Sequence, residues 1–461
     1  MMLSCLYQPK GFYRRLIYLS LPVIAQNLIT TSLGFMDTFM VGLLGSDQMA
    51  AVTVANVPIF IIQLIVFGLQ SGSSILISQY WGKGDRAAIN RVLGIGFFVA
   101  GGVSMLFALV MFFFPTSVLW LITDNALLVE LAAPYIRIVG FSYVFNALSS
   151  IYVGMQRSIE NPKFGMIVFA VSTVCNTLGN YILIFGKLGF PMLGIRGAAI
   201  ATLSSRIIEF AITFTYAMRC RTVPLQLSCI LRPGADIARS FVRYSTPVLL
   251  NETLWGLGNS LYTVIMGHMT ISGEIIAAYT VAGGIDKLVT ASLFGVAAAS
   301  AVIVGKEIGM GAPREDVFSI GKALAIVSIG LGILVGLTEV GLYLAILRPC
   351  VLPLFNLSAA SERICTLFIY AYSSAAPLHS FTVTVIVGVL RGGGDVRSAM
   401  LIDLLPLWIG TLPLLLLTAL VLKVPTALVC FVMAWEPLLK VPFGVWRLLG
   451  GKWIHDVTVK A

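Results

Sequence analysis

Charged residues are scarce in this chain of 461 residues: Asp, Glu, Lys and Arg make up 11% of it, whereas hydrophobic residues make up 58%. Soluble globular proteins contain about 25% charged residues. The scarcity of charge therefore excludes an ordinary soluble protein and indicates a chain that lies in a membrane.

Residues that hold metals and disulfides are also few. The chain has three His and seven Cys, and the Cys residues are odd in number and form no C-x-x-C pair. This pattern predicts neither a disulfide framework nor a structural metal site. The sequence also offers no paired nucleophile and base, so we expect a protein that is not an enzyme and needs no cofactor.

Motifs that bind nucleotides are missing as well. The chain has no Walker motif, and its Gly-rich loops GKGDRAAINR and RGGGDVR follow no predicted strand. We expect no cleavable signal peptide, because the apolar stretch after Arg14 and Arg15 is too long for a signal core. That stretch is expected to be the first membrane helix.

Apolar runs fill most of the chain. About 20 such residues suffice for one membrane crossing. We predict an all-α membrane protein with twelve transmembrane helices, near residues 15–44, 52–80, 93–122, 129–154, 164–186, 196–218, 240–268, 275–304, 320–347, 364–390, 398–422 and 425–447.

The formal net charge of +10 is distributed unevenly between the predicted loops. If the N-terminus is cytoplasmic, 22 Lys and Arg fall on the cytoplasmic side, 5 on the opposite side and 3 within spans. Positive residues accumulate on the cytoplasmic side of membrane proteins. We therefore expect a cytoplasmic-membrane protein with both termini in the cytoplasm, and no nucleic-acid partner.

The two halves of the chain repeat each other. PVIAQNLITTSLGFMDTFMVG at 22–42 matches PVLLNETLWGLGNSLYTVIMG at 247–267. An even number of helices per half places both halves in the same direction, related by an axis along the membrane normal. We predict two pseudo-symmetric six-helix bundles, with an N-terminal lobe at 1–220, a cytoplasmic linker at 221–239 and a C-terminal lobe at 240–461.

Asp37 stands in an otherwise apolar span of the first half. A buried acid in a membrane is costly, so it is found mostly where it handles ions, protons or charged substrate. Asn176, Asn180 and Thr202, on two later spans, add amide and hydroxyl oxygens. These four residues are our candidates for a coupling site, which could take Na⁺ transiently or a proton, because burial disfavours the charged form of Asp37. A structural hydrogen bond between Asp37 and the Asn residues is the alternative.

The second half carries a different acid. Glu252, Trp255, Asn259 and Tyr262 share one face of the span near 240–268. An acid with two aromatic rings suits an organic cation, although Trp255 and Tyr262 could be packing residues. We predict a substrate-binding or proton-binding site here, to which Asp403 could also contribute.

Other charged residues lie within predicted spans. Arg206 and Glu209 are three residues apart, which favours a structural ion pair. Asp286 and Lys287 are neighbours and point about 100° apart, so each could pair with another helix. Glu339 has no partner that is obvious from the sequence.

Several motifs together resemble the multidrug and toxic compound extrusion (MATE) family of prokaryotes. They are MDTFMVGLLG at 36–45, NTLGNYILIFG at 176–186, GIRGAAIAT at 194–202, PVLLNETLWGLG at 247–258 and LRGGGD at 390–395. The resemblance covers nearly the whole chain. It implies two six-helix lobes in a V shape that open alternately to each side, and export of organic, often cationic, drugs in exchange for Na⁺ or H⁺.

The resemblance also implies roles for particular residues. Asp37, Asn176 and Thr202 stand where prokaryotic members place cation ligands of the N-terminal lobe, but Asn180 replaces a frequent second Asp. Glu252 matches the Glu of an ion site in the C-terminal lobe. The Asp that completes that site in the family is replaced here by Ser380. Neither ion site is therefore complete in this sequence.

From these observations we expect a secondary active exporter of small organic cations that acts as a monomer. A flippase for a lipid-linked precursor is the alternative, but its anionic cargo would need a cleft lined with cations rather than with Asp37 and Glu252. A channel is disfavoured, because two unlike halves give no symmetric filter. Between the two coupling ions the sequence slightly favours H⁺, with Asp37 and Glu252 as its carriers.

Overall fold

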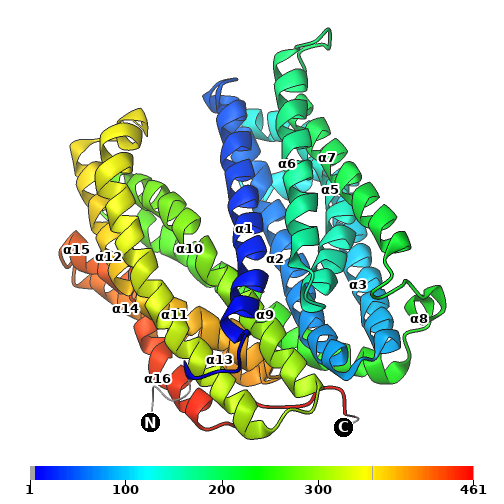
Figure 1. Cartoon of the computed structure of the whole chain (residues 1–461). Coiled ribbons are helices and arrows are strands. Elements are labelled where there is room, and N and C mark those ends of the chain that lie inside the picture. The colour runs from blue at the N-terminus through cyan, green and yellow to red at the C-terminus, as the bar shows by residue number, and fades with distance from the viewer. Residues whose placement is uncertain (1–5, 356, 460–461) are drawn as a thin grey trace. The chain divides into compact units, whose positions relative to one another are not determined.

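In a computed structural model, residues 6–355 and 357–459 are described, and nearly all of them lie in helices (Figure 1). The first half contains α1 (Phe12–Gly42), α2 (Ser46–Lys83), α3 (Arg86–Phe113), α4 (Pro115–Trp120), α5 (Ala126–Ser158), α6 (Pro162–Phe185), α7 (Ile195–Arg219) and α8 (Leu227–Leu231). The second half contains α9 (Ala235–Gly267), α10 (Ser272–Gly309), α11 (Arg314–Leu342), η2 (Tyr343–Val351), η3 (Leu352–Phe355), α12 (Ala359–Val383), η4 (Thr384–Leu390), α13 (Val396–Leu405), η5 (Pro406–Thr411), α14 (Leu412–Leu416), η6 (Leu417–Val421), α15 (Thr426–Ala434) and α16 (Glu436–Leu449).

Helices long and apolar enough to cross a membrane number 11 among the described residues. The remaining predicted span, near 240–268, coincides with α9, where Asn251, Glu252 and Asn259 interrupt the apolar residues. The predicted all-helical, multi-span membrane fold is thus confirmed. The outermost terminal residues, whose sidedness the charge count predicts, lie outside the described part of the chain.

Long helices of the second half contain π-helical turns. The segments η2, η4, η5 and η6 are of this kind, and they continue α11, α12, α13 and α14 without a break. Pro349 lies inside η2, and Pro406 begins η5. Since proline cannot donate a backbone hydrogen bond, it shifts the helical ladder, which accounts for two of the four π segments.

The chain divides into two compact units. One comprises the residues up to Ile24 together with Leu250–Val459, and the other comprises Ala25–Leu249. Hence α1 and α9 each contribute to both units, and each is divided two residues after a proline, Pro22 or Pro247. These are the matched prolines of the repeat. The division at 1–220, 221–239 and 240–461 follows the sequence repeat and stays a prediction.

Close helix packing in the unit of Ala25–Leu249 brings α6 and α7 together. A Cβ atom at Gly197 of α7 would lie 2.5 Å from the Leu183 carbonyl oxygen of α6, so only glycine fits. At Gly179 of α6, a Cβ would lie 3.0 Å from Ala201. Small residues that allow such approach are typical of helix contacts in membranes. This contact allows polar side chains of the two helices to meet.

A similar approach joins α11 and α12 in the other unit, where the two helices lie side by side (Figure 1). A Cβ at Gly332 would lie 2.5 Å from the Pro377 Cα atom, and one at Gly336 would lie 2.4 Å from the Ser373 carbonyl oxygen. Glu339 follows Gly336 by about one turn and therefore faces the same contact.

Candidate functional site

The four residues predicted for the coupling site are joined by hydrogen bonds. Asn180 Nδ2 donates to Asp37 Oδ1 at 2.6 Å and to Asn176 Oδ1 at 3.1 Å. Asn176 Nδ2 in turn donates to Thr202 Oγ1 at 3.3 Å. The network spans α1, α6 and α7, and Asp37 and Asn180 are 143 positions apart. The expected convergence of these three helices is therefore present, while the role of the four residues stays a prediction.

Burial differs along this network. The side chains of Asn176 and Asn180 are only 1% exposed, whereas Asp37 is half-buried. Asn180 Oδ1 is buried and accepts no hydrogen bond. Among the described residues, no Lys or Arg forms an ion pair with Asp37. The carboxylate is thus reachable, beside an unused oxygen acceptor, and lacks a paired cation.

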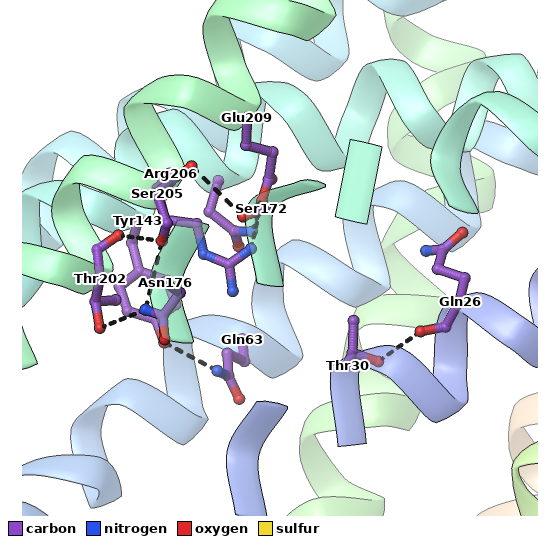
Figure 2. Close-up of polar contacts among 11 residues, drawn as sticks. Gln26, Thr30, Gln63, Tyr143, Ser172, Asn176, Thr202, Ser205, Arg206 and Glu209 are labelled. Atoms are coloured by element: carbon purple, nitrogen blue, oxygen red, sulfur yellow. Dashed lines mark hydrogen bonds and ion pairs between the residues drawn. The ribbon is translucent and has the colours of Figure 1, made fainter. Parts of the chain in front are cut away.

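Ser205 extends the network and was missed by sequence reasoning. Asn176 Nδ2 donates to Ser205 Oγ at 3.5 Å, and Ser205 Oγ donates to the Thr202 carbonyl oxygen at 2.8 Å (Figure 2). Ser205 follows Thr202 by three residues, which puts both on one helix face. That spacing is the signal that could have identified it.

The predicted pair of Arg206 and Glu209 is confirmed, with Arg206 Nη1 2.5 Å from Glu209 Oε2 (Figure 2). Ser172 donates to the same oxygen at 2.9 Å, and Asn146 donates to Glu209 Oε1 at 3.5 Å. Glu209 is fully buried. Because its charge is balanced and both oxygens have partners, Glu209 is suited to a structural role.

Thr30, which lies seven residues before Asp37 and therefore on the same face of α1, is not part of the network. Its hydroxyl lies 3.1 Å from the Gln26 carbonyl oxygen and 3.0 Å from that of Asn27 (Figure 2). Both are positions one turn earlier in α1, so the hydroxyl is satisfied by its own helix.

The polar residues predicted to act together on α9 have different interaction partners in the structure. Arg391 Nη1, directly after η4, donates to Glu252 Oε1 at 2.6 Å. Tyr262 is buried and donates to Glu436 Oε2 at 3.0 Å. Asn259 Nδ2 donates to the Trp255 carbonyl oxygen at 3.1 Å, within α9 itself. The Glu252 carboxylate and the Tyr262 hydroxyl therefore have different partners.

Trp255 packs beside a hydrophobic cluster that includes Tyr262 and Met266 of α9 and Phe368 of α12. The packing alternative that the sequence left open for Trp255 and Tyr262 thus describes their surroundings in this structure. The proposed cargo-binding role of these side chains stays a prediction.

Asp403 belongs to a chain of charges in the same unit. Lys440 Nζ lies 2.6 Å from Asp403 Oδ1 and 2.5 Å from Glu436 Oε1, and Asn251 Nδ2 donates to Asp403 Oδ2 at 2.8 Å. Lys440 is 5% exposed and Arg391 is 2% exposed. Sequence reasoning missed both as partners of buried acids. The spacing of four residues between Glu436 and Lys440 is typical of a helical ion pair and could have indicated one of them.

The chain resembles known transporters over most of its length. A model of the family described as MatE matches residues 22–182. A probable multidrug resistance protein NorM of Thermotoga maritima is 23% identical over 410 residues, which cover 87% of this chain and 84% of the relative. The multidrug resistance protein MdtK of Edwardsiella ictaluri is 26% identical over 427 residues, which cover 90% and 89%. These similarities relate the chain to MATE transporters over most of its length.

A solved structure of a multidrug resistance MATE family transporter, in an outward-facing conformation, shares the fold of this protein. Its TM-score is 0.85 at 18% sequence identity, with 96% of this chain and 99% of that one covered. The chain therefore has the multi-pass helical fold of that transporter.

Proposed function

We propose that this MATE transporter is a secondary active antiporter that exports organic, mostly cationic, drug-like compounds in exchange for H⁺. It would act as a monomer in the cell membrane, with both termini in the cytoplasm. The relatives NorM and MdtK are described as multidrug resistance proteins, which supports the class of cargo. The observation that carries the proposed coupling is the environment of Asp37.

Asp37 differs in its partner from three other acids of this membrane protein. Glu209, Glu252 and Asp403 are each within 2.6 Å of an Arg or Lys nitrogen. Asp37 instead accepts a hydrogen bond from the neutral amide of Asn180. A carboxylate without a paired cation is costly in a membrane. Binding a proton or a cation removes this cost, which suits a residue that must exchange its ligand in every transport cycle.

H⁺ is favoured over Na⁺ because most oxygens around Asp37 are already used. Asn176 Oδ1 accepts a hydrogen bond from Asn180, and Thr202 Oγ1 accepts one from Asn176. A hard cation needs several free oxygen ligands. A proton needs the carboxylate alone, and the vacant Asn180 Oδ1 is an acceptor that could receive its hydrogen bond.

Cargo is proposed to bind at Glu252, Trp255, Asn259 and Tyr262, as their spacing on α9 suggested, with a contribution from Asp403 of α13. In the present conformation Arg391 neutralises Glu252. A cationic compound would therefore have to replace the guanidinium as the partner of this carboxylate. Competition of this kind would couple cargo binding to a rearrangement of Arg391.

The flippase alternative receives less support from these contacts. Arg391 and Lys440 are buried cations of the kind that an anionic lipid headgroup would need, but each is already paired with an acid. These pairs leave no excess positive charge for a phosphate.

Efflux from proteoliposomes, with each ion gradient imposed alone, tests this proposal. A fluorescent organic cation should be exported when only a pH gradient is present and retained when only a Na⁺ gradient is present. Export driven by Na⁺ at equal pH, without a response to the pH gradient, would refute the proposed coupling. A liposome-embedded anionic lipid flipped by the protein would favour the alternative.

A further inference from the structure

Two acids of the unit that holds α10–α12 have no assigned role. Asp286 lies in α10 and Glu339 in α11, and an electrostatic interaction links them. Glu339 is 0% exposed, whereas Asp286 is half-buried. Among the described residues, no hydrogen bond connects either acid to the ion pairs of Glu252 and Asp403.

Glu339 has an unused oxygen. Ser373 of α12 donates to Glu339 Oε2 at 2.8 Å, while Glu339 Oε1 is buried and has no hydrogen-bond partner. The close approach of α11 and α12 at Gly336 fixes this geometry, because the Ser373 backbone leaves no space for a Cβ there. A buried acceptor atom without a donor is rare in native proteins, and a proton bound to the carboxyl would remove the charge on this one.

Among the described residues, no Lys or Arg forms an ion pair with either of these acids. Lys287, next to Asp286 on α10, acts on it electrostatically, but its side chain is exposed and is not paired with the carboxylate. The other buried carboxylates of this unit have Arg391, Lys440 or Arg447 as partners. Two carboxylates that share a site without a cation cannot both carry charge at low cost.

The remaining groups around the pair are also unable to supply positive charge. Tyr372, beside Ser373 on α12, interacts electrostatically with both Asp286 and Glu339. Tyr279 of α10 and Cys430 of α15 are its other titratable neighbours. Glu436 of α16 acts on Tyr279 and is itself paired with Lys440. Apart from the exposed Lys287, the surroundings of the two acids are therefore hydroxyls, a thiol and further negative charge.

We propose that Glu339, with Asp286 beside it, is a second proton-binding site of this transporter, separate from Asp37. A proton forms an O–H bond with Glu339 Oε1, which neutralises the buried charge and supplies the missing hydrogen. Asp286, the more exposed of the two carboxylates, passes the proton to and from Glu339. A metal cation is poorly provided for, because no group of three or more His, Cys, Asp or Glu suited to a metal occurs among the described residues.

This inference deepens the proposed exchange of H⁺ and rests on it, so two measurements are needed. The first is the infrared difference spectrum of reconstituted protein between acid and alkaline pH, which reports protonated carboxyl groups without transport. The wild-type protein should lose carboxyl bands on alkalinisation. Asp37→Asn should retain one band that Glu339→Gln removes.

The second measurement is the proton counterflow that accompanies export of an organic cation from proteoliposomes under a pH gradient. Glu339→Gln should lose the part of this counterflow that Asp37 does not carry, and Asp286→Asn should slow it. Gln keeps the shape of a protonated Glu, so a folded variant is expected, checked by size-exclusion chromatography. The matched control is Glu362→Gln, an exposed acid 3.6 Å from Arg348, which should behave as the wild type.

The outcomes separate the two proposals. An unchanged infrared band and unchanged counterflow in Glu339→Gln would overturn the second site while leaving the H⁺ exchange intact. Export driven by Na⁺ alone would overturn the proposed coupling, and the infrared difference between the wild type and Glu339→Gln would still decide whether Glu339 binds a proton. If Glu339→Gln is poorly folded, unchanged counterflow and spectrum in Asp286→Asn would also count against the site.

Discussion

In the unit of Ala25–Leu249, Asp37 is held by the amide of Asn180, whereas in the other unit Glu252 and Asp403 are held by Arg391 and Lys440. The two halves repeat each other in sequence but treat their predicted functional acids differently. Neutral partners leave a carboxylate free to exchange a proton or cation. Charged partners fix it, since breaking a buried ion pair is strongly unfavourable. The comparison indicates that homologous spans need not carry homologous chemistry.

The largest effect is expected for Asp37→Asn, which should abolish pH-driven export of an organic cation while the protein remains folded in the membrane. Asn keeps the size and the polarity of the side chain but cannot exchange a proton. Efflux from proteoliposomes measures this. Thr30→Val is the matched control on the same helix face, and it should export normally because the Thr30 hydroxyl bonds only within α1. Normal export by Asp37→Asn would make Asp37 structural, as its contact with Asn180 also allows.

Lys440→Met tests the ion-paired side of the comparison. Removal of the shared cation leaves the charges of Asp403 and Glu436 buried without a paired cation, and loss of one member of a buried pair destabilises a protein by about 3–5 kcal/mol. The free energy of unfolding in detergent measures this. Arg348→Met, at the exposed pair with Glu362, should change it by no more than about 1 kcal/mol. Similar changes in the two variants would show that burial of the Lys440 ion pairs does not contribute to the free energy of unfolding.

Glu252→Gln asks whether the paired acid also binds cargo. Binding of a cationic compound should weaken by an amount on the order of 2–5 kcal/mol, because a partly desolvated ion pair is lost. A neutral analogue of the same shape should lose little. Equilibrium binding of the two compounds to purified protein measures the difference. Equal losses would mean that Glu252 acts through Arg391 and not through the cargo.

Asn180→Ala is expected to have the smallest effect of the four. It removes the hydrogen bond to Asp37, and a hydrogen bond to a charged group contributes about 1.5–3 kcal/mol. Export should slow without being abolished, and its dependence on pH should change, because the amide stabilises the charged form of Asp37. Rates measured over a range of pH test this. Unaltered rates and an unaltered pH profile would show that the Asn180 amide does not affect the function of Asp37.

Sequence reasoning reached more of the site near Asp37 than of the site on α9. Asp37, Asn176, Asn180 and Thr202 were found because polar residues stand out in apolar spans, and they proved to be neighbours. On α9 the same reasoning assigned residues that share a helix face to one binding site. It could not indicate that Arg391, 139 positions from Glu252, would take up that acid.

Local spacing succeeded where both partners lie on one helix. Arg206 and Glu209 were predicted to pair from a separation of three residues, and they do. Glu339 had no partner that the sequence suggested, and its contact with Ser373 depends on the approach of α11 and α12 at Gly336. Spacing along one helix carries no information about which neighbouring helix its face will meet.

The sequence by itself determined the membrane class, the internal repeat, the resemblance of its motifs to those of the MATE family, and the polar residues that need an explanation. Only the tertiary structure decided which of those residues are held in ion pairs. Arg391 and Lys440 pair with Glu252 and Asp403, whereas Asp37, Asp286 and Glu339 have no ion-pair partner among the described residues. The physical reason lies in the solvent. In a bilayer, a helix face against lipid and a face against protein are both apolar, so the sequence pattern shows that a charge must be buried but does not show what it will be buried against.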